Sequence, residues 1–320
     1  MRVATSTAYS QGVTSMNTQN FKLNKTMLQL STGKRIVTPS DDPAGAAKVL
    51  GLNQAKSRTE QFQDNIDVLK SSLQVEETAL DSIVNTLQRV RELTIQANND
   101  TYDGNQRAAI SLEIQEHFEA ITGFANTTNG NGEFLFGGYN NRDVPFENVA
   151  GVVNYKGDQG QQLLQISATR QVASGDNGFD SFMNLRGTDN GSNPAYGIPM
   201  SVFAVVKELQ VALENNDGVI SGVVGAETFH ETMSRAIDNI DVALGQIVDI
   251  EASIGARLNA IENQENANED YLVQLATTLS NTQDLDYNEA VSRLEQEQIG
   301  LQASQQTFTK IQGLSLFNFL

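Results

Sequence analysis

The chain lacks cysteine and tryptophan altogether, and aromatic residues make up only 7% of its 320 residues. Because aromatic side chains dominate wide globular cores, their scarcity favours thin helical packing. The absence of Cys fits a reduced cell interior. It fits equally well a chain that is exported unfolded, in which a disulfide would obstruct threading.

Long hydrophobic runs are also missing, since no stretch reaches the roughly 20 apolar residues of a membrane span. No basic segment followed by an apolar one opens the chain, so we expect no cleavable secretory signal. The formal net charge is −18, yet residues 1–58 hold eight Lys or Arg against two acidic residues, giving +6 there and −24 elsewhere. The basic arm is either a solvated helix face or a partner for the acidic C-terminal arm. The strongly acidic total, without a basic patch interleaved with aromatics, argues against nucleic-acid binding.

Both ends of the chain repeat apolar residues at steps of three and four. This rhythm keeps a narrow apolar stripe on one helix face, as a coiled-coil seam requires. Five large apolar residues among residues 314–320 extend it at the C-terminus. We therefore predict terminal helices that pack on each other or on neighbouring subunits in a rod-shaped assembly protein. The predicted assembly interface is Met16, Leu23, Met27, Leu30, Leu294, Leu301, Phe308, Ile311, Leu314, Leu316 and Phe317.

Three longer segments carry stronger helical patterns. The first runs from about residue 44 to 97, the second from 105 to 126, and the third bears apolar residues from 233 to 279. The third stripe is interrupted by Glu251, Glu265 and Asn268, so we expect looser packing there. The stripe expected in the first helix is Phe62, Ile66, Leu69, Leu73, Glu76, Leu80, Ile83, Leu87, Val90, Thr94 and Ala97.

Residues 139–196 differ from the rest because they are rich in Gly, Asn and Asp. Apolar runs at 152–155 and 163–166 flank a Gly/Asp cluster at 156–160, which predicts a β-hairpin. We interpret this region as a small β-rich insert at the tip of a helical rod.

The predicted fold is therefore mainly α, a long antiparallel helical bundle or coiled coil built from both termini with a small β-rich insert domain. Residues 1–38 plus 288–320 are expected to form a terminal coiled-coil domain. Residues 39–138 plus 197–287 would form a long-helix bundle domain, and residues 139–196 an outer insert domain.

No motif predicts catalysis, a cofactor or a metal site. His117 and His230 each lie in a helical stretch without a nearby Cys or second His. Residues 284–295 place acidic groups at calcium-loop spacing, but Glu289 stands where the loop needs Gly. We expect Asp284 or Asp286 to cap the last helix instead. The sequence thus predicts a protein that is not an enzyme.

Four segments resemble bacterial flagellins and their hook–filament junction relatives. Residues 29–36 (QLSTGKRI) and 39–45 (PSDDPAG) carry the likeness near the N-terminus. Here Gly33 is expected to stop a helix, Pro39 to hold an extended linker, Asp41 or Asp42 to cap the next helix, and Pro43 to begin it. Residues 132–138 (GEFLFGG) and 303–317 look more like the hook-associated branch of this family than like filament flagellins.

The resemblance implies a structural protein of the bacterial flagellum that joins the hook to the filament. Its implied partners are a homo-oligomeric ring, another hook-associated protein, flagellin and an export chaperone of the FlgN type. It also implies a secreted, extracellular flagellar location, reached through type III export without a cleavable signal peptide. The alternatives are a filament-forming flagellin and, more distantly, a cytoplasmic coiled-coil adaptor.

Overall fold

The computed structural model describes residues 2–185, 200–215 and 228–313. The chain is mainly α, with two small two-stranded sheets, which confirms the predicted fold class. It divides into two compact units. The first is Met1–Glu60 with Glu269–Leu320, and the second is Gln61–Asn268. The three-domain division stays a prediction.

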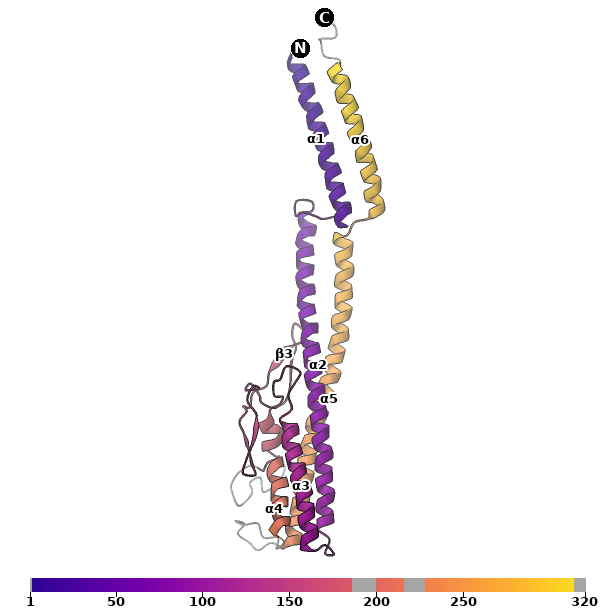
Figure 1. The fold of residues 1–320 in the computed structure, drawn as a ribbon. Helices are drawn as coiled ribbons and strands as arrows, with labels where there is room; N and C mark the ends of the chain where they lie inside the picture. The colour runs from indigo at the N-terminus through magenta and orange to yellow at the C-terminus, as the bar shows by residue number, and fades with distance from the viewer. Residues whose placement is uncertain (1, 186–199, 216–227, 314–320) are drawn as a thin grey trace. The chain divides into compact units, whose positions relative to one another are not determined.

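Helix α2 (Pro43–Ala97) provides the central stripe of the second unit (Figure 1). Of the eleven side chains expected on this stripe, only Phe62 is partly exposed, and the other ten are buried. The predicted periodicity is therefore confirmed over more than 30 residues of one helix. Two members, Glu76 and Thr94, are polar, and both are fully buried.

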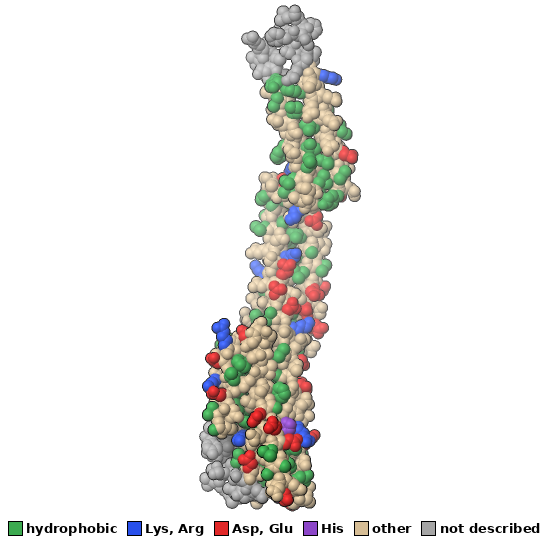
Figure 2. Space-filling view, in the orientation of Figure 1, with side chains coloured by type: hydrophobic (Ala, Val, Ile, Leu, Met, Phe, Trp, Pro, Cys, Tyr) green, Lys and Arg blue, Asp and Glu red, His purple; other side chains and the backbone are tan. Residues whose placement is uncertain are grey.

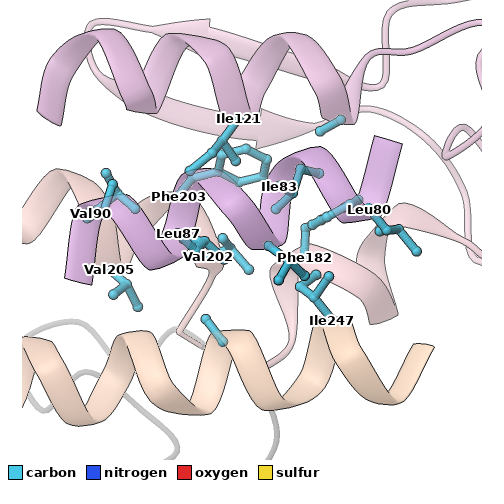
Figure 3. Packing of buried hydrophobic residues seen from close by; sticks show 14 of the residues in the cluster. Leu80, Ile83, Leu87, Val90, Ile121, Phe182, Val202, Phe203, Val205 and Ile247 are labelled. Carbon is cyan, nitrogen blue, oxygen red and sulfur yellow. The ribbon is translucent and has the colours of Figure 1, made fainter. Parts of the chain in front are cut away.

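Helices α3 (Gly104–Ala125) and α5 (Phe229–Gln283) cover this stripe, and their bounds agree with the predicted helices. Asp103 begins α3 with a reciprocal capping box, in which its side chain accepts from the Gln106 amide. Figure 3 shows α2 side chains such as Leu80 between Ile121 of α3 and Ile247 of α5.

Helix α4 (Val202–Asn215) is an element that the sequence patterns did not predict. Its apolar residues are too numerous to form a narrow stripe, and most of them are buried against α3 and the inner face of the insert. Its more exposed positions still follow a helical period, but its apolar face is wider than the narrow stripe of a coiled-coil seam, which the three-four rule follows. The buried apolar residues of α4 are Val202, Phe203, Val205, Val206, Leu209, Ala212 and Leu213.

The few aromatic residues gather where the insert meets the helices. Phe182, in the short π-helix η1 (Phe179–Met183), lies 4.9 Å from Phe136 and 5.5 Å from Phe146 between ring centroids. Phe146 lies 5.2 Å from Phe203 of α4. Edge-to-face and tilted pairs of this kind add to the stabilisation from buried area. The insert therefore has a true aromatic core that is continuous with the helical one.

The predicted pairing of 152–155 with 163–166 is wrong. Strand β1 (Phe146–Val149) pairs with β2 (Val152–Tyr155), and β3 (Leu163–Gln165) pairs with β4 (Gln171–Ala173), both antiparallel. The β1–β2 connection is a two-residue turn in which Ala150 and Gly151 have φ of 54° and 86°. Two left-handed residues match the twist of a tight hairpin, so the strand pairs with its nearer neighbour.

The prediction that the insert sits at a tip is wrong. It lies along the side of α2 and α5 within the second unit (Figure 1). Polar side chains on both helices bind its backbone. Asn65 donates to the Gln165 carbonyl at 2.7 Å, and Asn268 donates to the Ile166 carbonyl at 3.1 Å. Asn268 is buried, so the expected loose packing at this stripe position is wrong, because the insert covers it.

The buried stripe leads to a stability prediction. Leu80→Ala should lower the free energy of unfolding by about 2–5 kcal/mol, because it removes a fully buried side chain from a close-packed core. The matched control is Leu112→Ala on α3, where the side chain is 66% exposed and the change should stay within about 0.5 kcal/mol. Urea unfolding followed by circular dichroism measures both. Equal effects would contradict the assigned core.

Candidate assembly interface

Helices α1 (Arg2–Thr32) and α6 (Tyr287–Gly313) lie side by side in the first unit (Figure 1). Tyr9 contacts Phe308, with 5.2 Å between ring centroids, and Gly33 at the other end of α1 adjoins Tyr287. Residue numbers thus fall along α6 as they rise along α1, which makes the pair antiparallel. The expectation that the ends meet each other is met within a single chain.

Small residues let the two helices approach closely. A Cβ added at Gly12 would lie 2.9 Å from the ring of Phe308, and one at Gly300 would lie 2.5 Å from Gln19. Gly33 has φ of 69° and ends α1, as predicted, because only glycine takes this left-handed conformation freely. A side chain at Gly12 would therefore displace the ring of Phe308, whereas one at Gly300 would displace only the end of the Gln19 side chain.

The connections at the base of this pair are joined by backbone hydrogen bonds. Arg35 N–H donates to the Gln283 carbonyl at 2.7 Å, and Leu285 N–H donates to the Gly33 carbonyl at 3.0 Å. Lys34 and Asp284 form an isolated antiparallel bridge between these bonds. Two segments about 250 residues apart in sequence are therefore held in register.

Asp41 and Asp42 order the linker through different contacts. Asp41 accepts from Lys25 at 2.8 Å and from the Thr38 amide at 2.9 Å. The Lys25 hydrogen bond is the main reason that the Asp41 pKa falls to about 2. Asp42 accepts from the Gly45 amide at 2.9 Å and so caps α2 at Pro43, as predicted.

Pro39 departs from its predicted role. It lies in a turn rather than an extended linker, with the Asp41 amide donating to the Thr38 carbonyl at 3.0 Å. Proline suits the second position of such a turn because its fixed φ is that of the turn residue. In the connection between α5 and α6, Asp286 accepts from the amides of Asn288 and Glu289 and so caps α6. The prediction that Asp284 or Asp286 caps the last helix is confirmed.

The described members of the predicted assembly interface are incompletely covered within one chain. Met27 is 52% exposed. The half-buried members are Met16, Leu23, Leu30, Leu294, Leu301 and Phe308. Ile311 belongs to α6, but its side chain lies outside the described residues, as do Leu314, Leu316 and Phe317. Whether these side chains contact another subunit stays a prediction.

Several exposed apolar residues of the first unit were not predicted. Phe21 on α1 is 70% exposed and Ile299 on α6 is 67% exposed, and Leu50 and Val273 are similarly open. Figure 2 shows hydrophobic side chains along the face of the α1/α6 pair that is in view. The three-four rule follows one stripe per helix, so it passes over apolar residues on other faces. The sequence signal that could have found them is the number of apolar residues in these helices that lie off the predicted stripe.

Comparison with known proteins identifies the family. The model of the bacterial flagellin N-terminal helical region matches residues 3–141, and that of the C-terminal helical region matches residues 237–320. The chain belongs to the bacterial flagellin family. The first region spans nearly all of α1 and the whole of α2 and α3, and the second spans most of α5 and the whole of α6. None of the helices in the described ranges combines the length and apolar character that crossing a membrane requires.

Two relatives differ in how much of the chain they match. Flagellar hook-associated protein 3 of Escherichia coli (strain K12) is 28% identical over 321 residues, covering 99% of each chain. A flagellin of Clostridium tyrobutyricum is 33% identical over 166 residues, covering 50% of this chain and 40% of its own. The crystal structure of Xanthomonas campestris FlgL has a TM-score of 0.61 at 21% identity, covering 72% of this chain and 99% of that one, and so shows the same fold.

The shallow cover of the terminal helices predicts where proteases act first. Within the described parts of α1 and α6, only Thr26, Gln29 and Ala290 are buried. Because few of their side chains are buried, the free energy of local opening is small, and these helices should unfold transiently before the core does. Trypsin should cut dilute monomer early at Lys22 and Lys25 of α1, at Lys310 of α6 and, once α1 opens, at Lys34 and Arg35 just beyond it. Arg89 and Arg257 should be spared.

Mass spectrometry of a digestion time course measures this order of cleavage. Arg89 is a demanding control because its side chain is 48% exposed, although it lies on the well-packed part of α2. Cleavage at Arg89 as fast as at Lys22 would contradict the prediction. Resistance at all five terminal sites would mean that the α1/α6 pair is stable alone.

The pKa of Asp41 gives a pH prediction for the linker. The folded value, about 2, lies below the ordinary value of 3.8, so Asp41 stabilises the fold above pH 4 and loses this contribution as the pH falls toward 2. Asp41→Asn should lower the thermal unfolding midpoint at pH 6 and change it much less at pH 2. Asp64→Asn, at an exposed position on α2, is the control and should have little effect at either pH.

Proposed function

We propose that this chain is a structural protein of the bacterial flagellum that forms the junction between hook and filament. The observation that carries the proposal is the extent of similarity. The chain aligns end to end with hook-associated protein 3, whereas flagellin relatives match only part of it. A filament subunit would be expected to follow flagellins over their own length as well. The pattern favours the junction protein over the filament-forming flagellin.

The predicted interface supplies the physical basis for assembly. Two helices packed side by side can bury only one face each. Apart from Ala290, the apolar side chains of α1 and α6 that the structure describes remain half-buried or exposed. Apolar surface left in water is a driving force for association, worth about 25 cal/mol per Å² when buried. We infer that neighbouring subunits cover this face and complete a helical inner layer.

Several finer features of the proposal follow from the family. We infer a homo-oligomeric ring that contacts another hook-associated protein on one side and flagellin on the other. Its route would be export through the flagellar type III apparatus with an FlgN-type chaperone and no cleaved signal. In this proposal the protein acts through its surfaces and is not an enzyme.

The proposed layers follow the predicted domains. Residues 1–38 plus 288–320 would form the inner layer, the long-helix bundle a second layer, and residues 139–196 the outer one. The side-on position of the insert along α2 and α5 is compatible with an outward face. A cytoplasmic coiled-coil adaptor, the more distant alternative, gains no support from relatives that are flagellar proteins.

The test uses a flagellated bacterium that lacks its own junction protein. The wild-type chain should restore swimming and retain filaments on hooks. Met27→Asp should abolish both while leaving the monomer folded, because this predicted interface residue is 52% exposed and a charge there meets water in the free chain. Leu112→Asp, at a 66% exposed site on α3 outside the predicted interface, is the matched control and should still swim.

Experiments with purified protein separate a junction protein from a filament-forming flagellin, and the location of the protein in cells tests the cytoplasmic adaptor. The wild-type chain alone should stay soluble without forming long filaments, and it should bind purified hooks and flagellin in a pull-down. Long filaments from the chain alone would favour a filament-forming flagellin. Retention of the protein inside cells that have a working flagellar exporter would favour the cytoplasmic adaptor.

A further inference from the structure

Glu76 is an ionisable residue in the centre of an apolar stripe. It occupies a stripe position of α2 between Leu73 and Leu80, and all three side chains are fully buried. An acidic residue without solvent access is costly when charged, and the assembly surfaces proposed above do not use it. Its burial therefore calls for a specific local partner.

That partner is a segment of the insert, residues 174–177. The backbone amide of Asp176 donates to Glu76 Oε1 at 3.0 Å. The other carboxyl oxygen, Oε2, is buried without a hydrogen-bond partner. A Cβ added at the neighbouring Gly175 would lie 3.4 Å from this oxygen, at van der Waals contact, so the segment lies directly over the carboxyl.

The same segment is held from its other side by α5. The carboxylate of Asp176 forms an ion pair with Arg257, whose side chain is only 18% exposed. Its second oxygen accepts from Gln161 Nε2 at 3.0 Å. Residue 176 thus links α2 through its backbone and α5 through its side chain, and the segment lies clamped between the two helices.

We propose that Glu76 is a proton-operated clasp, which fastens residues 174–177 to α2 while its carboxyl is protonated and releases them when it ionises. A neutral carboxyl brings no charge into this buried site, whereas a carboxylate would place a charge on Oε2, which no hydrogen-bond donor reaches. It would also face the carboxylate of Asp176. Ionisation therefore favours an open state in which water reaches Glu76.

The charged surroundings support this direction. Burial, and after it the charge of Asp176, raise the pKa of Glu76 to about 8. The hydrogen bond from the Asp176 amide and, after it, the charge of Arg257 oppose this rise but do not cancel it. On α2 itself the next residue, Glu77, also carries a carboxyl, and further acidic groups line the adjoining cavities. These groups are Glu133 beside Gly175, and Asp180 and Asp249 in the groove along α5.

The sign of the pH effect follows from linkage. The folded pKa, about 8, is above the ordinary value of 4.5, so the closed clasp binds one proton more than the open one between these values. Closure is therefore fully favoured below about pH 4.5 and weakens as the pH rises to about 8. The equilibrium constant for opening should rise roughly tenfold per pH unit between these two pKa values and should level off above about pH 8.

Release would be local, because other contacts tie the insert independently. Gln246 of α5 donates to the Asp180 carbonyl at 2.7 Å and to the Asn184 carbonyl at 3.1 Å. Asn65 and Asn268 hold the β3 end. None of these groups titrates near neutral pH. The clasp would thus loosen residues 174–177 while the rest of the insert stays in place.

Hydrogen exchange of the full chain tests the clasp. After correction for the intrinsic pH dependence of exchange, the amides of peptides spanning 174–177 should open about tenfold more at pH 7 than at pH 6 in the wild type. Glu76→Gln keeps an acceptor oxygen and cannot ionise, so its opening should not change with pH. The matched control, Glu77→Gln at the next position of the same helix, should behave as the wild type does.

A direct titration removes dependence on the variant's folding. The carboxyl ¹³C resonance of Glu76, in chain labelled at glutamate, should titrate with a midpoint near 8. A midpoint near 4.5 would overturn the proposal, and so would equal pH dependence of opening in the wild type and a folded Glu76→Gln chain. Should Glu76→Gln fail to fold, the titration midpoint alone decides.

Discussion

The fold of the second unit depends on burying one uninterrupted stripe of α2. From Ile66 to Ala97 every stripe position is buried, and one long helix cannot achieve this alone. Helices α3, α4 and α5 and the aromatic core of the insert each cover part of it. Because the stripe is narrow, the covering elements must follow its length, and this explains a core that is long and only a few side chains wide.

Buried polar residues in the apolar stripes of α2 and α5 mark where the insert attaches. A buried polar group without a partner is costly, so Glu76 and Asn268 restrict the backbone segments that can lie over them. Both are met by the insert, through the Asp176 amide and the Ile166 carbonyl. These positions are therefore attachment points rather than defects of the helical packing. They fix the register of the insert, as polar residues do in coiled coils.

The first unit, in contrast to the second, leaves most of its apolar side chains incompletely covered. Its two terminal helices are close where glycine permits, at Gly12 and Gly300, but two helices leave most of their apolar residues partly open. The linkers beneath them are well ordered by backbone bridging and by the Asp41 and Asp42 carboxylates. The first unit therefore combines ordered linkers with a helix pair whose apolar residues are incompletely covered, and the proposed assembly rests on this contrast.

The sequence alone determined the parts of this protein that depend on local periodicity and capping. The α2 stripe, the extent of α3, the course of α5 and the end of α1 at Gly33 are all set by residues within a few turns of one another. So is the presence of an aspartate cap before α2 and before α6, although only the structure selects Asp42 and Asp286. The sequence also identified the family, through its terminal motifs. Tertiary structure decided what depends on contacts distant in sequence. Strand β2 pairs with β1 because Ala150 and Gly151 form a tight turn between them, and the fold decides which elements cover the wide apolar face of α4. Only the fold brings Asp176 and Arg257 to Glu76, since their pairing needs three elements that no local pattern relates.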